Sequence, residues 1–160
     1  MKTGIAQNWT RRGLLAAALG AAALPALAQL VGFPTSPMTI ETADGRRHAF
    51  TVEVALTDAQ QMQGLMYRRS LEPDRGMIFI YKADAPLAMW MKNTYIPLDM
   101  LFLSADGRII NLIENVPPQT LDSRPSDGPA RAVVELAAGT VARLGIRPGD
   151  RVIHDRLTGR

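Results

Sequence analysis

Short apolar or alternating stretches separated by turn residues run from Met38 to His154, and this spacing restricts the fold more than any other feature. Alternation of apolar and polar residues, as in 50–54, is typical of a half-buried strand, and a continuous apolar run such as 77–81 is typical of a buried one. We expect strands at residues 38–41, 50–54, 77–81, 87–92, 98–103, 108–113, 131–136 and 151–154. Seven or eight short strands predict a mainly β fold, an antiparallel sandwich or a partly open barrel with two short helices at the margin of the α+β class.

Two Asp-Gly steps, at Asp44-Gly45 and Asp106-Gly107, lie between consecutive predicted strands. An Asp-Gly step between apolar runs is a strong hairpin signal. By contrast, residues 117–129 contain four prolines and one glycine. That composition predicts a long polar loop of the kind that often carries binding groups.

The first helix is predicted by Thr57 and Gln60, which have the spacing of a capping box. It should run for two to three turns and end near Tyr67 or Arg68. Gly64 inside it costs about 1 kcal/mol relative to alanine, so we expect close approach by another backbone there. The second helix is predicted at residues 140–144 and is closed by Gly145, after which the chain turns into the last strand.

The first 28 residues have the pattern of a secretory signal peptide. A basic stretch ending in Arg11-Arg12 precedes the apolar residues 14–24 and the small-residue run 26–28. The arginine pair favours twin-arginine export, with general secretion as the alternative. Residues 14–28 are too short for a bilayer span, which needs about 20 residues. We therefore predict a periplasmic or secreted protein without a membrane span, with a signal peptide at 1–28, a flexible leader at 29–37, one β-rich domain at 38–156 and a tail at 157–160.

The net charge of +3 belongs to the predicted signal peptide. Three of the 18 basic residues lie there, without any acidic residue, so the remaining 15 equal the 15 acidic side chains. Such a balance lacks the basic stripe needed for phosphate backbones, and nucleic acid is not expected as a partner. The chain has no cysteine and only His48 and His154 as imidazoles. This excludes thiol chemistry and leaves little material for a zinc site, so no cofactor is expected.

Five strings in the chain resemble one family closely. The strings are residues 64–68, 76–79, 90–94, 97–102 and 134–139. They are similar to the bacterial and archaeal family called domain of unknown function 192, and the resemblance extends from about Thr51 to Ile153. It implies a compact, β-rich and often exported domain, and it implies no activity, cofactor or catalytic residue.

Asp99 lies between Leu98 and Met100 in an apolar predicted strand, where a carboxylate must be paired or hydrogen-bonded. If residues 87–92 and 98–103 form an antiparallel pair, one register places Lys92 opposite Asp99 and Trp90 opposite Leu101. Such a cross-strand pair contributes roughly 0.2 to 1 kcal/mol. A structural ion pair and a functional role both remain open.

The function that this pattern favours is non-catalytic binding. Trp90 offers an aromatic plate beside hydrogen-bonding groups, without an obvious nucleophile. The ligand is expected to be a small polar or saccharide-like molecule or a cell-envelope partner, held by a monomer. The predicted ligand-binding residues are Trp90, Lys92, Asn93, Thr94, Asp99 and Arg68. Asn93 and Thr94 have the alternative role of stabilising their own turn.

A hydrolase is the first alternative, with Asp99 and Glu135 as general acid and base and Lys92 lowering the pKa of Asp99. It requires that the two carboxyl groups face one cavity within about 5 to 10 Å. Glu135 has the competing interpretation of pairing with Arg68 or with a loop backbone.

Copper binding is the second alternative. Six methionines fall within 39 residues, at positions 62, 66, 77, 89, 91 and 100. Thioethers select Cu(I), and Met89 and Met91 would share one strand face with Trp90 on the other. Methionine is also an adaptable core residue, and Met62, Met66 and Met77 are placed where we expect the core, so core packing is the favoured interpretation.

Overall fold

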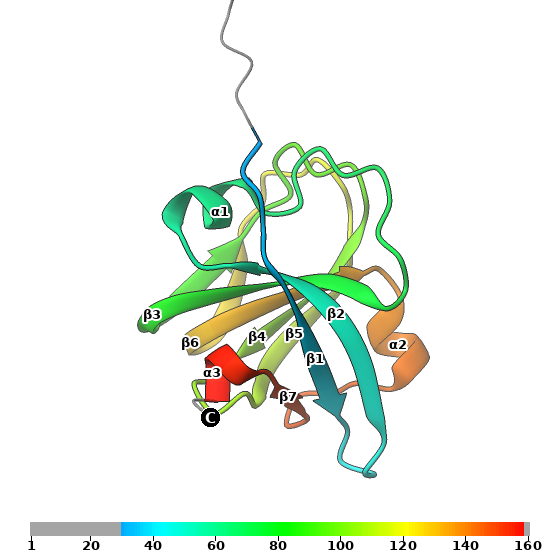
Figure 1. Cartoon of the computed structure of the whole chain (residues 1–160). Coiled ribbons are helices and arrows are strands. Elements are labelled where there is room, and N and C mark those ends of the chain that lie inside the picture. The colour runs from blue at the N-terminus through cyan, green and yellow to red at the C-terminus, as the bar shows by residue number, and fades with distance from the viewer. Residues whose placement is uncertain (1–29, 159–160) are drawn as a thin grey trace, which may run out of the picture.

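The computed structural model describes residues 30–158, which form a seven-stranded mixed sheet curved into a half-barrel (Figure 1). The strand order is β5-β4-β6-β3-β2-β1-β7. The strands are β1 Thr35–Glu41, β2 Arg47–Ala55, β3 Arg75–Met89, β4 Leu98–Leu103, β5 Ile109–Val116, β6 Arg124–Ala137 and β7 Arg151–Ile153. The helices are α1 Asp58–Gln63, α2 Thr140–Leu144 and α3 Asp155–Thr158. The mainly β prediction is confirmed, although β2 and β3 run parallel.

The signal peptide predicted at residues 1–28 lies outside the described residues. Among residues 30–158 there is no helix with the length and apolar character of a membrane span.

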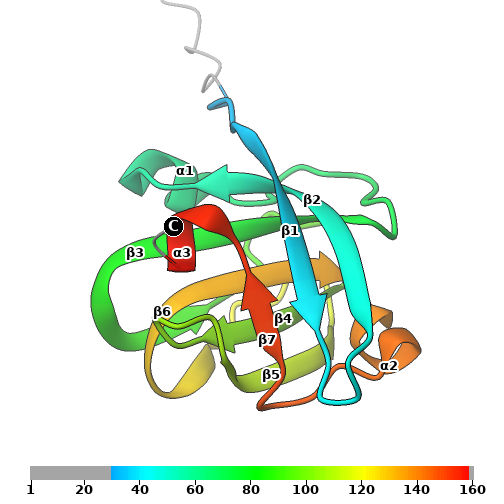
Figure 2. The ribbon, with the colours of Figure 1, turned by 60° about the horizontal axis from the view of Figure 1, so that its bottom comes forward.

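The two edge strands of the sheet meet at one end, which we call the closed end. Arg108 and Arg151 form an isolated antiparallel bridge. The Ile109 N–H donates to the Asp150 carbonyl at 2.9 Å, and the Val152 N–H donates to the Gly107 carbonyl at 2.8 Å. In Figure 2 the start of β7 lies beside β5 at this end. The partly open barrel of the prediction is therefore observed.

Both predicted hairpins are present. β1 pairs antiparallel with β2, with Met38 opposite Phe50, and β4 pairs antiparallel with β5. β1 begins at Thr35, so three residues of the predicted leader form strand. The residues before it also bond to the domain, because the Val31 N–H donates to Gln63 Oε1 at 2.7 Å. At the other end of the chain, Leu157 of α3 is only 9% exposed and packs into the core, which extends the domain beyond its predicted end.

The capping box of α1 is confirmed. The Gln60 N–H donates to Thr57 Oγ1 at 3.2 Å, and the Thr57 N–H donates to Gln60 Oε1 at 3.1 Å. The helix ends at Gln63 rather than near Tyr67, because Gly64 has a φ of 47° and leaves the helical region. A Cβ on Gly64 would lie 3.1 Å from the Phe79 ring. The close approach predicted at this glycine is thus to a side chain, and the expected backbone neighbour was wrong.

β3 is a single 15-residue strand, where the sequence predicted two strands at 77–81 and 87–92. Beyond Ile80 it continues, through two irregularities, as a ribbon with the outer half of β6. Residues 124–129 of the predicted loop belong to that ribbon. Pro86 lies opposite Pro129 there, and prolines are tolerated because a two-stranded ribbon needs fewer ladder donors.

The sheet is buried on both faces. The first core contains Ile78, Leu101 and Val134 and is covered by α2 and α3, with Val152 of β7 contributing to it. The second core contains Phe79 and Met100 and is covered by Leu65 of the turn after α1 and by the loop after β3. Burial on both faces explains why several strands are continuously apolar instead of alternating.

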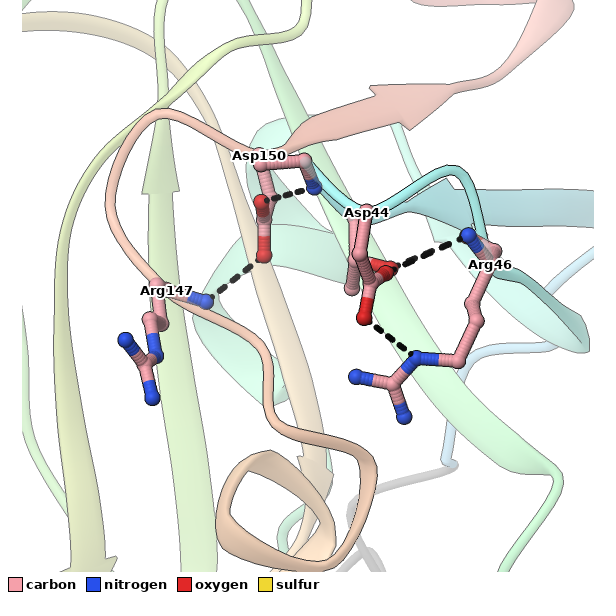
Figure 3. Close-up of polar contacts among 6 residues, drawn as sticks. Asp44, Arg46, Arg147 and Asp150 are labelled. Carbon is pink, nitrogen blue, oxygen red and sulfur yellow. Dashed lines mark hydrogen bonds and ion pairs between the residues drawn. The ribbon is translucent and has the colours of Figure 1, made fainter.

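A buried carboxylate fastens the β1–β2 turn to the turn before β7 (Figure 3). Asp150 is 5% exposed and accepts hydrogen bonds from the Ala43 N–H at 2.8 Å and the Arg147 N–H at 2.7 Å. Beside it, Asp44 pairs with Arg46 at 2.8 Å. The closed end thus contains one buried carboxylate, Asp150, which two backbone N–H groups satisfy, and one exposed carboxylate, Asp44, which is paired with Arg46.

Candidate functional site

A small pocket, which we call the loop-end pocket, opens between α1, the turn after it, and the loop after β3. In Figure 1 α1 lies at the top of the molecule, with the loops that cover this part of the sheet. The pocket has about 20 Å³ of free space, enough for one water-sized group. Its lining includes Met66, Phe79, Trp90, Lys92, Thr94 and Glu135. The strings at 64–68, 90–94 and 134–139 therefore converge on one place.

Glu135 lies within β6, between Met77 of β3 and Met100 of β4. The residue is only 4% exposed, and within residues 30–158 its carboxyl group has neither a hydrogen bond nor an ion pair. Burial raises its pKa to about 8, from an ordinary 4.5. Burial also raises the pKa of Tyr81, and the charge of Glu135 adds to that rise. A carboxyl in this state either keeps its proton near neutral pH or accepts a positively charged or donating partner.

Asp99 is fully buried and has two partners. Its Oδ1 accepts from the Asn115 N–H at 2.8 Å, and its Oδ2 accepts from the Val141 N–H at 2.9 Å. The second bond satisfies the first turn of α2, whose N-cap, Gly139, has no side chain to do so. Asp99 is thus a structural residue that caps a helix from a neighbouring strand.

The predicted pairing of Lys92 with Asp99 is wrong. β4 pairs with β5 and β6, and Asp99 lies opposite Leu136. The end of β3 pairs with the outer half of β6, and the chain leaves the sheet at Trp90. Consecutive strands do not pair here because β6 lies between them.

Asp99 and Glu135 are on opposite faces of the sheet. Asp99 is on the face of Leu101, which belongs to the first core, and Glu135 is on the face of Val133, which belongs to the second. The structure therefore does not bring the two carboxyl groups to one bond, as the hydrolase hypothesis requires.

The loop after β3 carries most of the predicted binding residues. Trp90 is 45% exposed, and the Lys92 Nζ lies 5.2 Å from the centroid of its ring. Thr94 lines the pocket and its hydroxyl donates to the Lys92 carbonyl at 3.3 Å. Asn93 lies outside the pocket lining, and its Nδ2 donates to the Tyr67 hydroxyl at 3.1 Å. The loop thus stabilises its own turn and also contributes Trp90, Lys92 and Thr94 to the pocket lining.

Arg68 pairs with Glu53 and not with Glu135. It lines a different depression, with Thr51 and Ser70. Arg68 therefore does not belong to the loop-end pocket, and the suggested pairing of Glu135 with Arg68 was wrong.

The methionines divide into two groups. Met91 is fully buried in the second core, as are Met77 and Met100. Met62, Met66 and Met89 line the loop-end pocket, and Met62 is 66% exposed. The predicted pair of Met89 and Met91 is thus divided between pocket and core, and Met62 is not in the core where we expected it.

Backbone strain gathers around the same loops. Tyr67, Asn93 and Gln119 have positive φ values of 67°, 54° and 59°. Positive φ is rare in residues other than glycine, especially bulky ones such as Tyr67, and costs about 1 to 3 kcal/mol each. Hydrogen bonds between loops stabilise these strained conformations. The Tyr67 N–H donates to the Asn93 carbonyl at 2.8 Å, and the Gln119 N–H donates to the Thr94 carbonyl at 3.0 Å.

Sequence reasoning missed Tyr67 and Tyr95, whose rings form an edge contact with centroids 6.1 Å apart. They are 46% and 42% exposed, so aromatic surface extends beyond Trp90. It also missed Met66 as a lining residue, although this methionine lies within the string 64–68 that carries the family resemblance. Among the described residues, no cluster of three or more His, Cys, Asp or Glu is arranged to hold a metal ion.

Comparison with known proteins agrees with the sequence resemblance. The model of the DUF192 family, described as an uncharacterized ACR, matches residues 39–154. The crystal structure of a candidate transcription regulator from Sinorhizobium meliloti 1021 is 48% identical with a TM-score of 0.76, covering 77% of this chain and 95% of that one. A protein of unknown function from Novosphingobium aromaticivorans DSM 12444 is 41% identical with a TM-score of 0.74, covering 83% and 94%. No curated protein matches the chain.

Proposed function

The chain belongs to the DUF192 family, and from this premise we propose that it is a non-catalytic binding domain whose site is the loop-end pocket. The ligand is a small polar or saccharide-like molecule, free or part of a cell-envelope component. The observation that carries the proposal is the Glu135 carboxyl group, which is buried, lines the pocket and lacks a partner among the described residues. The Glu135 oxygens are not among the fully enclosed side-chain atoms that lack a partner in the described residues, so they are open to the pocket, where a ligand group or water can donate to them.

The size of the pocket limits what enters it. Its 20 Å³ accommodates one hydroxyl-sized or amino-sized group, which would hydrogen-bond to Glu135 and Thr94. The rest of the ligand would lie outside, against the exposed face of Trp90. Tyr95 and Tyr67 would extend this aromatic surface for a longer ligand.

Binding is favoured over hydrolysis because of the separation of the acids. Asp99 is occupied by two backbone amides and faces the other core, so Glu135 has no second carboxylate within the pocket lining. Regulation of transcription through DNA is not favoured either. Outside the predicted signal peptide the chain has equal numbers of acidic and basic side chains.

Fluorescence titration provides the test. The chain has two tryptophans, and because Trp9 lies in the predicted signal peptide, Trp9→Phe makes Trp90 the only tryptophan even in the full, uncleaved chain. Titration with neutral sugars, amino sugars and cell-wall oligosaccharides should change its emission saturably.

Glu135→Gln should weaken binding at least about tenfold, because a carboxylate acceptor becomes an amide. The matched control, Glu114→Gln on the exposed part of β5, should bind as the parent does. Calorimetry should show loss of binding in Trp90→Ala. Equal affinity in all variants, or no binding by any compound, would refute the proposal.

Export completes the proposed function, since it would place a monomeric binding domain among cell-envelope components. Replacing Arg11 and Arg12 with lysine keeps the charge and removes the arginine pair. Retention of this variant inside the cell, with the parent exported and cleaved after Ala28, would support the twin-arginine route. Full export of the variant would leave general secretion as the route, and an uncleaved parent in the membrane would refute export of a free domain.

A further inference from the structure

Three thioether side chains line the loop-end pocket, and they differ from the other methionines. Met62 lies in α1, Met66 in the turn after it, and Met89 at the end of β3. The remaining methionines among residues 30–158 are at most 2% exposed and belong to the two cores, namely Met38, Met77, Met91 and Met100. Core packing explains the second group. It does not explain Met62, which is 66% exposed.

Two of the three methionines contact polar donors that lie just outside the pocket lining. Asn93 Nδ2 donates to Met66 Sδ at 3.9 Å, and the Tyr81 hydroxyl donates to Met89 Sδ at 4.0 Å. Both are weak contacts, because a thioether is a poor acceptor. The Met66 and Met89 sulfur atoms therefore each have a polar neighbour as well as apolar ones, and a soft metal ion can replace the weak donor as the partner of the sulfur lone pair.

The charge at the pocket selects the ion. The lining carries two charged side chains, the buried Glu135 carboxyl and the Lys92 ammonium, so the acid offsets only part of an added positive charge. A monovalent ion therefore costs less than a divalent one in a lining that also includes Phe79 and Leu65. The Trp90 ring already has the Lys92 ammonium at 5.2 Å, which shows that its face accepts a cation.

We infer that the loop-end pocket binds a single soft monovalent cation, Cu(I) or its analogue Ag(I), through the sulfur atoms of Met62, Met66 and Met89, with the Glu135 carboxylate as the anionic group beside them. Thioethers favour Cu(I) over hard ions such as Mg²⁺, which take oxygen ligands. The space of 20 Å³ suits one ion better than a large ligand. The inferred metal site shares the pocket and Glu135 with the proposed saccharide site, but it depends on thioethers that the saccharide does not need.

The test uses the full chain with Trp9→Phe, so that Trp90 reports on the pocket. Ag(I) should bind one to one by calorimetry and quench the Trp90 emission, and Cu(I) should be taken from a chromogenic Cu(I) chelator under anaerobic, reducing conditions. Mg²⁺ and Zn²⁺ should compete with neither. Absence of one-to-one binding of both Ag(I) and Cu(I) would overturn the inference.

Methionine variants locate the ion. Met66→Leu and Met89→Leu keep side-chain volume and remove sulfur, and each should weaken binding about 10-fold to 100-fold. The matched control is Met38→Leu, which removes a sulfur from the first core and should leave affinity unchanged. Circular dichroism would show whether each variant is folded, and Met62→Leu, on an exposed helix position, provides a variant that should not disturb folding. Equal affinity of all four variants would overturn the assignment.

The two proposals can fail separately. Met66→Leu should weaken metal binding and keep saccharide binding. Trp90→Ala should lose saccharide binding and keep metal binding, because all three thioethers remain. A metal that binds without any saccharide response would contradict only the proposed function, and the reverse result would contradict only the metal site.

Discussion

Asp99 and Glu135 are buried acids on adjacent strands, one on each face of the same sheet, and their surroundings are opposite. Asp99 accepts two backbone N–H groups, at 2.8 and 2.9 Å, and links β5 and α2 to β4. Glu135 accepts none among the described residues and lines a pocket. The sequence around each acid is similar, a single carboxylate within an apolar strand. The difference shows that local sequence reveals a buried acid, whereas its neighbours in the fold decide whether that acid is satisfied.

The two ends of the molecule repeat this difference. At the closed end, Asp150 is satisfied by two backbone amides and the edge strands are bridged. At the loop end, Tyr67 and Asn93 hold positive φ angles and Trp90 is half exposed. Satisfied carboxylates stabilise the first end. Strain and an unsatisfied carboxyl, which reduce stability, are concentrated where the ligand is proposed to bind.

The largest expected effect comes from Asp99→Ala. It leaves the N–H groups of Asn115 and Val141 buried without an acceptor, and hydrogen bonds to a charged group contribute about 1.5 to 3 kcal/mol each. We expect a loss of about 3 to 6 kcal/mol in the free energy of unfolding, measured by urea denaturation at pH 7. The exposed control Glu114→Ala should change stability by less than about 0.5 kcal/mol. A loss below about 1 kcal/mol in Asp99→Ala would contradict the structural role.

The next effect is a pH dependence due to Glu135. Its pKa is about 8 in the folded protein and 4.5 ordinarily, so the folded state keeps a proton that the unfolded chain releases between these pH values. Stability therefore falls as pH rises through this range, by up to about 4 kcal/mol between pH 5 and pH 8. Glu135→Gln should remove this fall, as measured by urea denaturation across the range.

Burial lowers the pKa of His154, which acts in the opposite direction because its contribution to stability is lost as pH falls below 6.5. The informative quantity is accordingly the difference between the parent and Glu135→Gln at each pH, from which the His154 contribution cancels. A difference that is constant from pH 5 to pH 8 would show that Glu135 has a partner in solution.

Gly64→Ala should have a smaller effect. The residue has a φ of 47° and its new Cβ would lie 3.1 Å from the Phe79 ring. We expect a loss of about 1 to 3 kcal/mol and a weaker ligand site, because the turn that carries Met66 would shift. Gly45→Ala is the control, since it has a φ of 83° with open space around it and is distant from the pocket. Equal effects of both variants on ligand binding would show that the turn at Gly64 does not shape the pocket.

Trp90→Ala should have the smallest effect on stability, within about 1 kcal/mol, because the ring is 45% exposed. Its thermal midpoint should stay near that of the parent while saccharide binding is lost. A collapse of folding would place Trp90 in the core and contradict its binding role.

Features encoded within a few residues were predicted well. The hairpin turns, the capping box at Thr57 and Gln60, and the end of α2 at Gly145 all follow from local hydrogen bonding and backbone preferences. Trp90 and Thr94, two of the predicted binding residues, both line the loop-end pocket, and their binding role stays a prediction. The pairing of Lys92 with Asp99 failed because it assumed that consecutive strands pair, whereas β6 inserts between β3 and β4.

The sequence by itself determined the strand content, the turns, the family and the fact that two buried acids need an explanation, because these depend on side-chain periodicity and local backbone preference. Only the tertiary structure decided which acid is satisfied and which methionines meet at a pocket. A side chain on a strand points to alternate faces, and strand order fixes what lies opposite. That order is set by contacts between residues far apart in the chain. This is why Asp99 reaches the helix at Val141 while Glu135, across the sheet, faces an open pocket.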